Sequence, residues 1–268
     1  MSSDESTALL LAGALGGPFT IALYTPLRNA ITLGAHDPSA SASSLYRRTV
    51  SHGYIRGGFA GWAAPTFFSS AQFVAMGPLY HKYASLCGPD LAVIPTALTE
   101  STITYGSQTR NAQIAHNLNV ANMPEKAVRL QAPWDPRGAG FAPHVLRNAC
   151  AMSGIRVLSP PIRKAMGAEG NVALSFAADF SATILSAAIS MPFNQLFNFL
   201  TTTHSTHIAE AGILSSCARF LRTQYLTPAG RFSATVLRDA FMRVAYIAPQ
   251  LSTYSAIERF ATARARRE

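Results

Sequence analysis

Apolar residues along this chain gather into six long stretches, separated by shorter polar ones. Each stretch reaches or exceeds the ~20 residues with which a helix crosses ~30 Å of hydrocarbon. We therefore expect an all-α membrane protein with six transmembrane helices. Their expected ranges are residues 9–32, 61–86, 91–116, 145–166, 172–200 and 236–260. Because Ser and Thr interrupt several stretches, a buried all-α soluble domain is the alternative.

Two landmarks recur with nearly one period. The first is a helix-breaking residue inside an apolar stretch, and the second is a Gly-Phe-type sequence that opens the next stretch. The first landmarks are Pro26, Gly106 and Pro192, and the second begin at Gly58, Gly140 and Gly230. A long period of this kind is typical of repeat architectures. We predict three tandem two-helix repeats, residues 1–88, 89–170 and 171–268, forming one integral membrane domain.

Composition supports a membrane location. Apolar residues make up 49% of the chain and charged residues only 13%, against about 25% charged residues in soluble domains. The mean hydropathy of +0.16 is low for helices that face lipid on all sides. It suits helices with one face on lipid and the other on a polar cavity.

The net charge of +9 is concentrated in the connections inside the three repeats. These basic residues are Arg47, Arg48, His52 and Arg56, then Lys126, Arg129 and Arg137, then Arg219, Arg222 and Arg231. This bias predicts that all three connections lie on one side of a membrane. A nucleic-acid surface is disfavoured because the basic residues are not interleaved with aromatic ones.

Catalytic and metal-binding patterns are absent from the sequence. It contains no phosphate-binding P-loop, no Gly-x-Ser-x-Gly elbow and no His-Glu-x-x-His motif. The three cysteines lack metal-ligand spacing, so we expect free thiols and no metal site. The first residues resemble neither a secretory signal nor a transit peptide. We expect a protein that is not an enzyme and has no cofactor.

Several segments carry a resemblance. Residues 22–27 (ALYTPL) and 52–61 (HGYIRGGFAG) lie in the first repeat, Gly140-Phe141 and Leu146-Arg147 in the second, and residues 190–194 (SMPFN) and 232–238 (FSATVLR) in the third. In order and spacing the chain is similar to the mitochondrial carrier family over nearly its whole length. The resemblance implies three repeats, each with a Pro-kinked odd-numbered helix, a matrix-side amphipathic helix and an even-numbered helix. It also implies a multi-pass protein of the mitochondrial inner membrane.

The chain departs from the family at the matrix gate. Family members carry Pro-x-Asp/Glu-x-x-Lys/Arg, whose charges form salt bridges that close the cavity. Here the degenerate gate positions hold Pro26, Arg28 and Ile31, then Gln108 and Asn111, then Pro192, Asn194 and Phe197. These residues predict no three-fold ion-pair network, although a one-residue shift in the second repeat would place Arg110 at a basic position.

The family's substrate contacts correspond to Arg147-Asn148 and Arg238-Asp239, counted from the Gly-Phe entries. An Arg in a water-filled membrane cavity is a functional candidate and suits a carboxylate or phosphate. The alternative is internal ion pairing of these Arg residues with Asp239, Asp179 or Glu100. Glu100 and Asp179 lie deep in the apolar stretches, where they either relay protons or pair with Arg147, Arg156 or Arg243.

Two loop-to-helix turns, Arg56-Gly57 and Arg137-Gly138, are candidate lipid-phosphate sites. In the family, similar turns hold cardiolipin; ordinary helix capping is the alternative here. Two functional hypotheses follow. The first is a carrier fold that has lost transport and serves as a subunit of a larger respiratory or ATP synthase complex. The second is a divergent carrier for a small anionic metabolite.

Overall fold

The computed structural model describes residues 3–168 and 170–265, and within these ranges the regular elements are helices. The all-α class predicted from the sequence is confirmed. Residues 3–87 form α1 (Ser3–Leu23), α2 (Thr25–Gly34), α3 (Ala42–Val50), η1 (Tyr54–Gly58), α4 (Ala63–Val74), η2 (Ala75–Leu79) and α5 (Tyr80–Cys87). Residues 89–165 form α6 (Pro89–Asn119), η3 (Pro124–Lys126), α7 (Phe141–Ser153), η4 (Gly154–Leu158) and α8 (Ser159–Ala165). The remainder forms α9 (Val172–Thr201), α10 (Ser205–Ala211), α11 (Ile213–Tyr225) and α12 (Ala234–Ala265).

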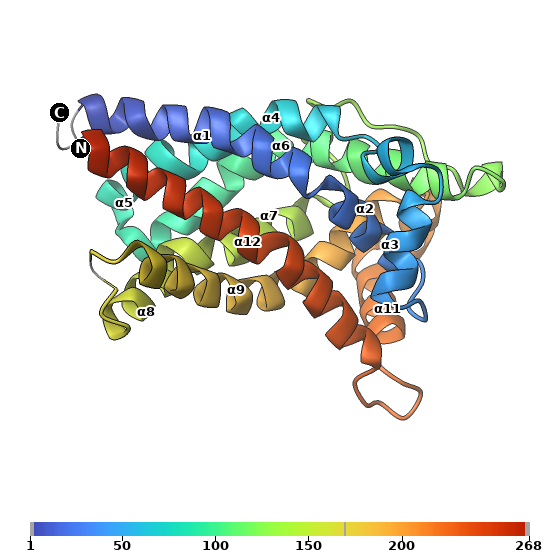
Figure 1. Ribbon diagram of the computed structural model, residues 1–268. Coiled ribbons are helices and arrows are strands. Elements are labelled where there is room, and N and C mark those ends of the chain that lie inside the picture. The colour runs from blue at the N-terminus through green and yellow to red at the C-terminus, as the bar shows by residue number, and fades with distance from the viewer. Residues whose placement is uncertain (1–2, 169, 266–268) are drawn as a thin grey trace.

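The long helices close into a ring. In chain order α1 packs against α4, α4 against α6, α6 against α7, α7 against α9 and α9 against α12, and α12 returns to α1. Figure 1 shows α1 beside α12, with the start of α1 and the end of α12 at one end of the bundle and α3 and α11 at the other. We call the end with α3 and α11 the loop side. There α2, α6 and α9 also contact one another, so the loop side of the ring is narrow.

The helices coincide with the six expected stretches to within a few residues. The stretch 172–200 corresponds to α9, whose start is capped by the Asn171 side chain accepting a hydrogen bond from the backbone N–H of Leu174. In the described residues, Glu5–Leu23 and Val172–Thr201 are long and apolar enough to cross a membrane. For all six stretches, membrane crossing stays a prediction.

The predicted breaks are only partly right. The chain does interrupt its helix at Tyr24, next to Pro26, between α1 and α2. The breaks expected at Gly106 and Pro192 are wrong, because α6 and α9 run through these positions without interruption. Instead, the lack of a side chain at Gly106 lets the backbone of the connection after α6 pack closely against this helix. A Cβ there would lie 2.6–2.7 Å from the carbonyl oxygens of Ala132, Pro133 and Asp135.

The loop-side amphipathic helix is present in the first and third repeats, as α3 and α11. The second repeat lacks it, so this expectation is wrong there. Its connection contains only the three-residue η3 and otherwise runs without regular structure to Gly140. Side chains of α6 hold this segment: Asn117 Oδ1 accepts from the backbone N–H of Val128 at 2.9 Å, and Gln113 Oε1 from that of Gln131 at 2.7 Å.

Two even-numbered helical stretches contain a π-helical turn at comparable places, η2 between α4 and α5 and η4 between α7 and α8. Both turns have a local cause. Pro78 lies inside η2, and Pro160 and Pro161 follow one residue after the end of η4, so normal i→i−4 donors are missing. The stretch formed by α12 has no such turn.

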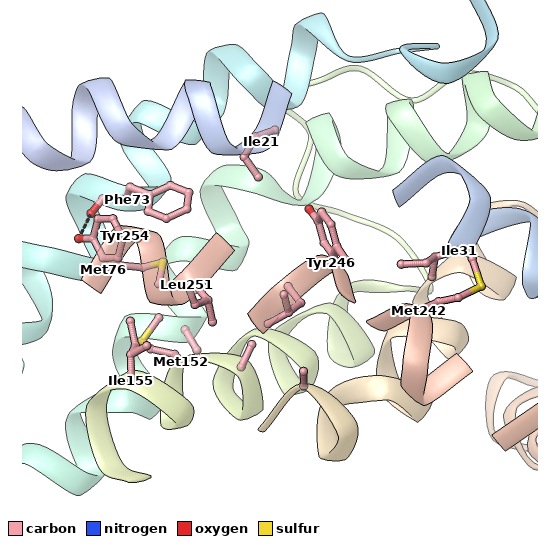
Figure 2. Packing of buried hydrophobic residues seen from close by; sticks show 14 of the residues in the cluster. Ile21, Ile31, Phe73, Met76, Met152, Ile155, Met242, Tyr246, Leu251 and Tyr254 are labelled. Carbon is pink, nitrogen blue, oxygen red and sulfur yellow. Dashed lines mark hydrogen bonds between the residues drawn. The ribbon is translucent and has the colours of Figure 1, made fainter. Parts of the chain in front are cut away.

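The outer surface of the ring is apolar on each of its six helices. One exposed residue from each helix illustrates this: Leu15 (72%), Phe67 (77%), Ile94 (62%), Leu146 (47%), Leu185 (51%) and Phe241 (67%). The interior is packed at the end away from the loop side. Figure 2 shows Tyr254 donating a hydrogen bond to the carbonyl of Phe73 at 3.1 Å, with Met76 and Leu251 beside them. Apolar residues therefore cover the outside and also close one end of the inside.

Candidate functional site: a central polar cavity

One predicted gate residue from each predicted repeat lies in the wall of a cavity inside the ring. Arg28, Gln108 and Asn194 each lie two residues after a landmark residue, and all three line one cavity. Arg28 Nη1 donates to Gln108 Oε1 at 2.9 Å. Asn194 Oδ1 accepts from Arg147 Nη1 at 2.8 Å. Arg28 and Gln108 thus contact each other directly, whereas Asn194 contacts Arg147. In both contacts a cation donates to a neutral amide oxygen.

The positions five residues after the landmarks have separate roles. Asn111 Nδ2 donates to the carbonyl of Ala60 at 2.6 Å, and Ile31 packs into the apolar core. The ring of Phe197 lies under the Arg147 guanidinium, with 3.8 Å from Cζ to the ring centroid. Within the described part of the chain, no ion pair involves Arg28 or the residues at the other gate positions.

The cavity is small and strongly charged. It offers about 50 Å³ of water-accessible space, which is room for a few water molecules. Three buried guanidiniums line it, those of Arg28, Arg147 and Arg243, against one carboxylate, that of Glu100. The wall also contains the side chain of Tyr246 and five amide side chains, those of Gln72, Gln108, Asn148, Asn194 and Gln250.

The charge balance of this cavity favours an anion. Arg28 Nε and Nη2 and Arg147 Nε are buried and have no hydrogen-bond partner in the part of the chain that the structure describes. Buried donors without partners are costly, and an anion with several oxygens would satisfy them. Glu100 Oε1 accepts from Gln72 Nε2 at 2.6 Å and forms no ion pair among the described residues.

The four predicted substrate-contact residues separate into two groups. Arg147 and Asn148 line the cavity. Arg238 and Asp239 do not, so their assignment to the cavity wall is wrong. They pair with each other at 2.8 Å, and Arg238 also donates to the carbonyls of Gly34, Asp37 and Ala40. This pair fixes α12 to the end of α2.

Sequence reasoning missed Arg243 as a cavity residue. The count from Phe232 is misleading because α12 begins only at Ala234, after a bridge between Leu226 and Phe232, whereas α7 begins at Phe141 itself. The equivalent of Arg147 therefore lies further along α12. The available signal was a second Arg in the same apolar stretch, between one and two turns beyond Arg238.

The two deep acids have different surroundings. Glu100 faces the cavity, whereas Asp179 lies near the end opposite the loop side. Asp179 pairs with Arg259 and, at 3.7 Å, with Arg163, and Ser159 donates to it. Its expected pairing with Arg147, Arg156 or Arg243 is wrong, since Arg156 pairs with Glu258 at 2.8 Å. Ion pairs therefore tie the even-numbered stretches to α9 at this end.

A second contact between the repeats lies deeper on the loop side, ten residues after each landmark. These positions hold His36, His116 and Thr202. The His36 and His116 ring centroids are 4.8 Å apart, and His36 Nε2 is hydrogen-bonded to Thr202 Oγ1 at 2.6 Å. Polar contacts between the repeats therefore hold the narrow end shut at two levels.

The candidate lipid turns differ in their surroundings. Arg56 and Gly57 lie in η1, where the Thr49 carbonyl closely covers Gly57. Gly138 lines a 400 Å³ cavity together with Arg129. Arg137 is engaged by Asp135, and its hydrogen bonds hold the pKa of that carboxyl below the usual value. The second turn therefore adjoins a cavity with an available cation, Arg129 in place of Arg137.

No group of three or more His, Cys, Asp or Glu side chains in residues 3–168 and 170–265 is arranged to hold a metal ion. Comparison of the chain with protein-family models and with curated proteins gives no match in either case.

Proposed function

We propose that this chain is a degenerate carrier-fold protein of the mitochondrial inner membrane that serves as an accessory or structural subunit of a larger respiratory or ATP synthase complex. The six-membered ring, its apolar outer face and the polar layer inside it are consistent with such a fold. An apolar surface on all six helices of a ring with a polar interior is also typical of a face that binds lipid or a partner protein.

The observation that carries the proposal is that, among the described residues, the cations at the gate contact amide oxygens and no carboxylate. Alternating access needs two states of similar free energy, each with contacts that the other lacks. Here Arg28–Gln108 and Arg147–Asn194 replace charge pairs. The internal space of about 50 Å³ is also too small for a typical metabolite. Both features favour a protein that remains in one closed state.

The proposal is tested by mild solubilisation of native membranes, a non-denaturing gel and detection of this chain by mass spectrometry. We expect co-migration with a large respiratory or ATP-synthesising complex. Migration near 28.6 kDa plus detergent, at several detergent concentrations, would contradict the subunit assignment.

A second candidate function is transport or binding of a small anion, and the surplus of guanidiniums over carboxylates in the cavity favours it. Arg147 and Arg243 would hold the anion, and Arg28 would contact it from the loop side. Uptake of labelled phosphate or dicarboxylates into proteoliposomes tests this candidate. Loss of uptake in Arg243→Gln with retention in Arg222→Gln, an exposed site, would support it. No uptake above empty liposomes would exclude it.

Bound lipid is part of the proposal. The cavity beside Gly138 and Arg129 suits an acidic phospholipid such as cardiolipin. Thermal stabilisation by cardiolipin that is lost in Arg129→Gln would support this site, and equal stabilisation of both proteins would argue against it.

A further inference from the structure

A separate cavity lies on the loop side, away from the ring axis, between the ends of α2 and α9 and the helices α10 and α11. Its volume is about 340 Å³, at the lower end of the range for small-molecule sites. No residue in its wall also lines the central cavity. It is therefore distinct from the central cavity, and it adjoins the 400 Å³ cavity beside Gly138, with which it shares Thr203 and Ile208.

The wall of this cavity carries nitrogen-bearing side chains and no carboxylate among the described residues. Arg219 comes from α11, His207 from α10, and His36 from the segment after α2. The Arg219 guanidinium makes no ion pair or side-chain hydrogen bond with any residue that the structure describes. It is exposed and free to bind an incoming group.

The neighbouring acids are engaged elsewhere. Asp37, next to His36, pairs with Arg48 at 2.7 Å. Asp239 accepts a hydrogen bond from Gln224, a wall residue, but is paired with Arg238. Glu210 is exposed on α10 and does not line the cavity. The local field inside the cavity is therefore positive.

The rest of the wall is suited to a ligand with a phosphate and a carbon portion. Ser216, a hydroxyl without a hydrogen-bond partner among the described residues, supplies a further donor. The stacked rings of Phe199 and Phe220, with centroids 4.6 Å apart and planes 20° from parallel, form an apolar surface. Guanidinium, imidazole and hydroxyl donors together match the oxygens of a phosphate.

We propose that this cavity is a binding site for a phosphate group, held by Arg219, His207 and Ser216, with the attached carbon portion on Phe199 and Phe220. The phosphate belongs either to a free phosphate ester or to a phospholipid headgroup, since both present the same oxygens. The site does not depend on transport or on membership of a complex. Ligand bound there would join α11 to α10 and to the end of α9.

The test uses the full-length protein in nanodiscs of neutral phosphatidylcholine, titrated calorimetrically with inorganic phosphate. A parallel arm compares thermal unfolding in phosphatidylcholine discs with and without phosphatidic acid. The variant is Arg219→Gln. The matched control is Arg222→Gln, which changes an exposed Arg of the same helix that does not line the cavity.

We expect Arg219→Gln to weaken phosphate binding about tenfold, the loss of one charged hydrogen bond. His207→Gln should weaken it too, and Arg222→Gln should stay within about twofold of the unchanged protein. Stabilisation by phosphatidic acid alone, lost in Arg219→Gln, would identify the lipid as the source. Absence of binding in both arms, or equal effects of Arg219→Gln and Arg222→Gln, would overturn the proposal.

Discussion

Arg28 and Gln108 lie 80 residues apart in the chain, close to one repeat length, and are joined by a hydrogen bond of 2.9 Å. The contact links positions that the landmark spacing places at the same level of two repeats. It therefore supports the register in which Gln108, and not its neighbour, occupies the gate position. Arg110, the alternative from a shifted register, donates to the carbonyl of Gln131 in the connection instead.

Replacing Gln108 by Leu should destabilise the protein by about 1–3 kcal/mol, since the buried guanidinium of Arg28 loses the amide oxygen that accepts its Nη1 hydrogen bond. The double variant Arg28→Met with Gln108→Leu should recover most of this loss, because neither partner is then left unsatisfied. Thermal unfolding in detergent measures both. A double variant as unstable as the sum of two single variants would show that the pair is not coupled.

Gly106→Ala should cost about 1–3 kcal/mol by overpacking, since the new methyl would meet three carbonyl oxygens of the facing connection. Gly16→Ala is the matched control, because a Cβ at Gly16 has its nearest neighbour at 3.5 Å. The control should be neutral or stabilising by up to about 1 kcal/mol in its helix. Limited proteolysis of residues 127–139 provides a second measurement: cleavage should accelerate only in Gly106→Ala.

Arg238→Met should lower the unfolding temperature, since four acceptors around one guanidinium lose their donor. We expect a cost of about 3 kcal/mol, typical of breaking a buried ion pair. Anion binding in the central cavity should be unchanged in folded Arg238→Met, because the side chain does not line it. Arg243→Met should lose anion binding in the central cavity and should keep most of its stability. The same stability and the same anion binding in both variants would contradict the placement of Arg243 in the cavity and Arg238 outside it.

Acidification should loosen the loop side through His36. Burial, and then the charge of His116, lower the pKa of His36 to about 4 from about 6.5. The folded protein therefore holds this imidazole neutral, and its contribution to stability is complete above pH about 6.5 and is lost as the pH falls toward 4. The unfolding temperature, measured from pH 7.5 to 4.5, should fall less with decreasing pH in His36→Asn than in the unchanged protein.

The groups facing His36 set the control for this experiment. His116 and Thr202 contact it directly, Phe199 lies beside it, and His207 and Arg219 share its cavity. His204 adds charge near His116. His52→Asn, at an exposed site in the first repeat, should leave the pH dependence unchanged. An identical pH profile in His36→Asn and the unchanged protein would show that another of these groups dominates.

The sequence predicts the helices well because their apolar stretches are long and their ends are marked, as Asn171 marks the start of α9. The sequence predicts breaks inside helices poorly. A Gly such as Gly106 keeps its backbone N–H and C=O groups, so a helix can continue through it. Pro192 similarly removes one donor without ending α9. The need for Gly at 106 comes from a connection about 30 residues away, which no local pattern reveals.

The site is predicted in part for a similar reason. The gate positions follow from spacing within each repeat, and three of them, Arg28, Gln108 and Asn194, line the central cavity. Arg243 was missed and Arg238 misplaced because positions on α12 were counted from the Gly-Phe-type sequence at its start. In the third repeat this sequence is longer than in the other two, so the counted positions are shifted. Neither the pairing of Arg238 with Asp239 nor the packing around the small cavity can be read from one helix at a time.

The unequal connections on the loop side affect how the protein can be oriented by a neighbour. A protein with three equivalent sides could bind a neighbouring protein in three equivalent orientations about the ring axis. The second side presents an irregular segment with exposed Trp134 (73%) where the other two present α3 and α11. The shape of the second connection therefore distinguishes one of these three orientations from the other two.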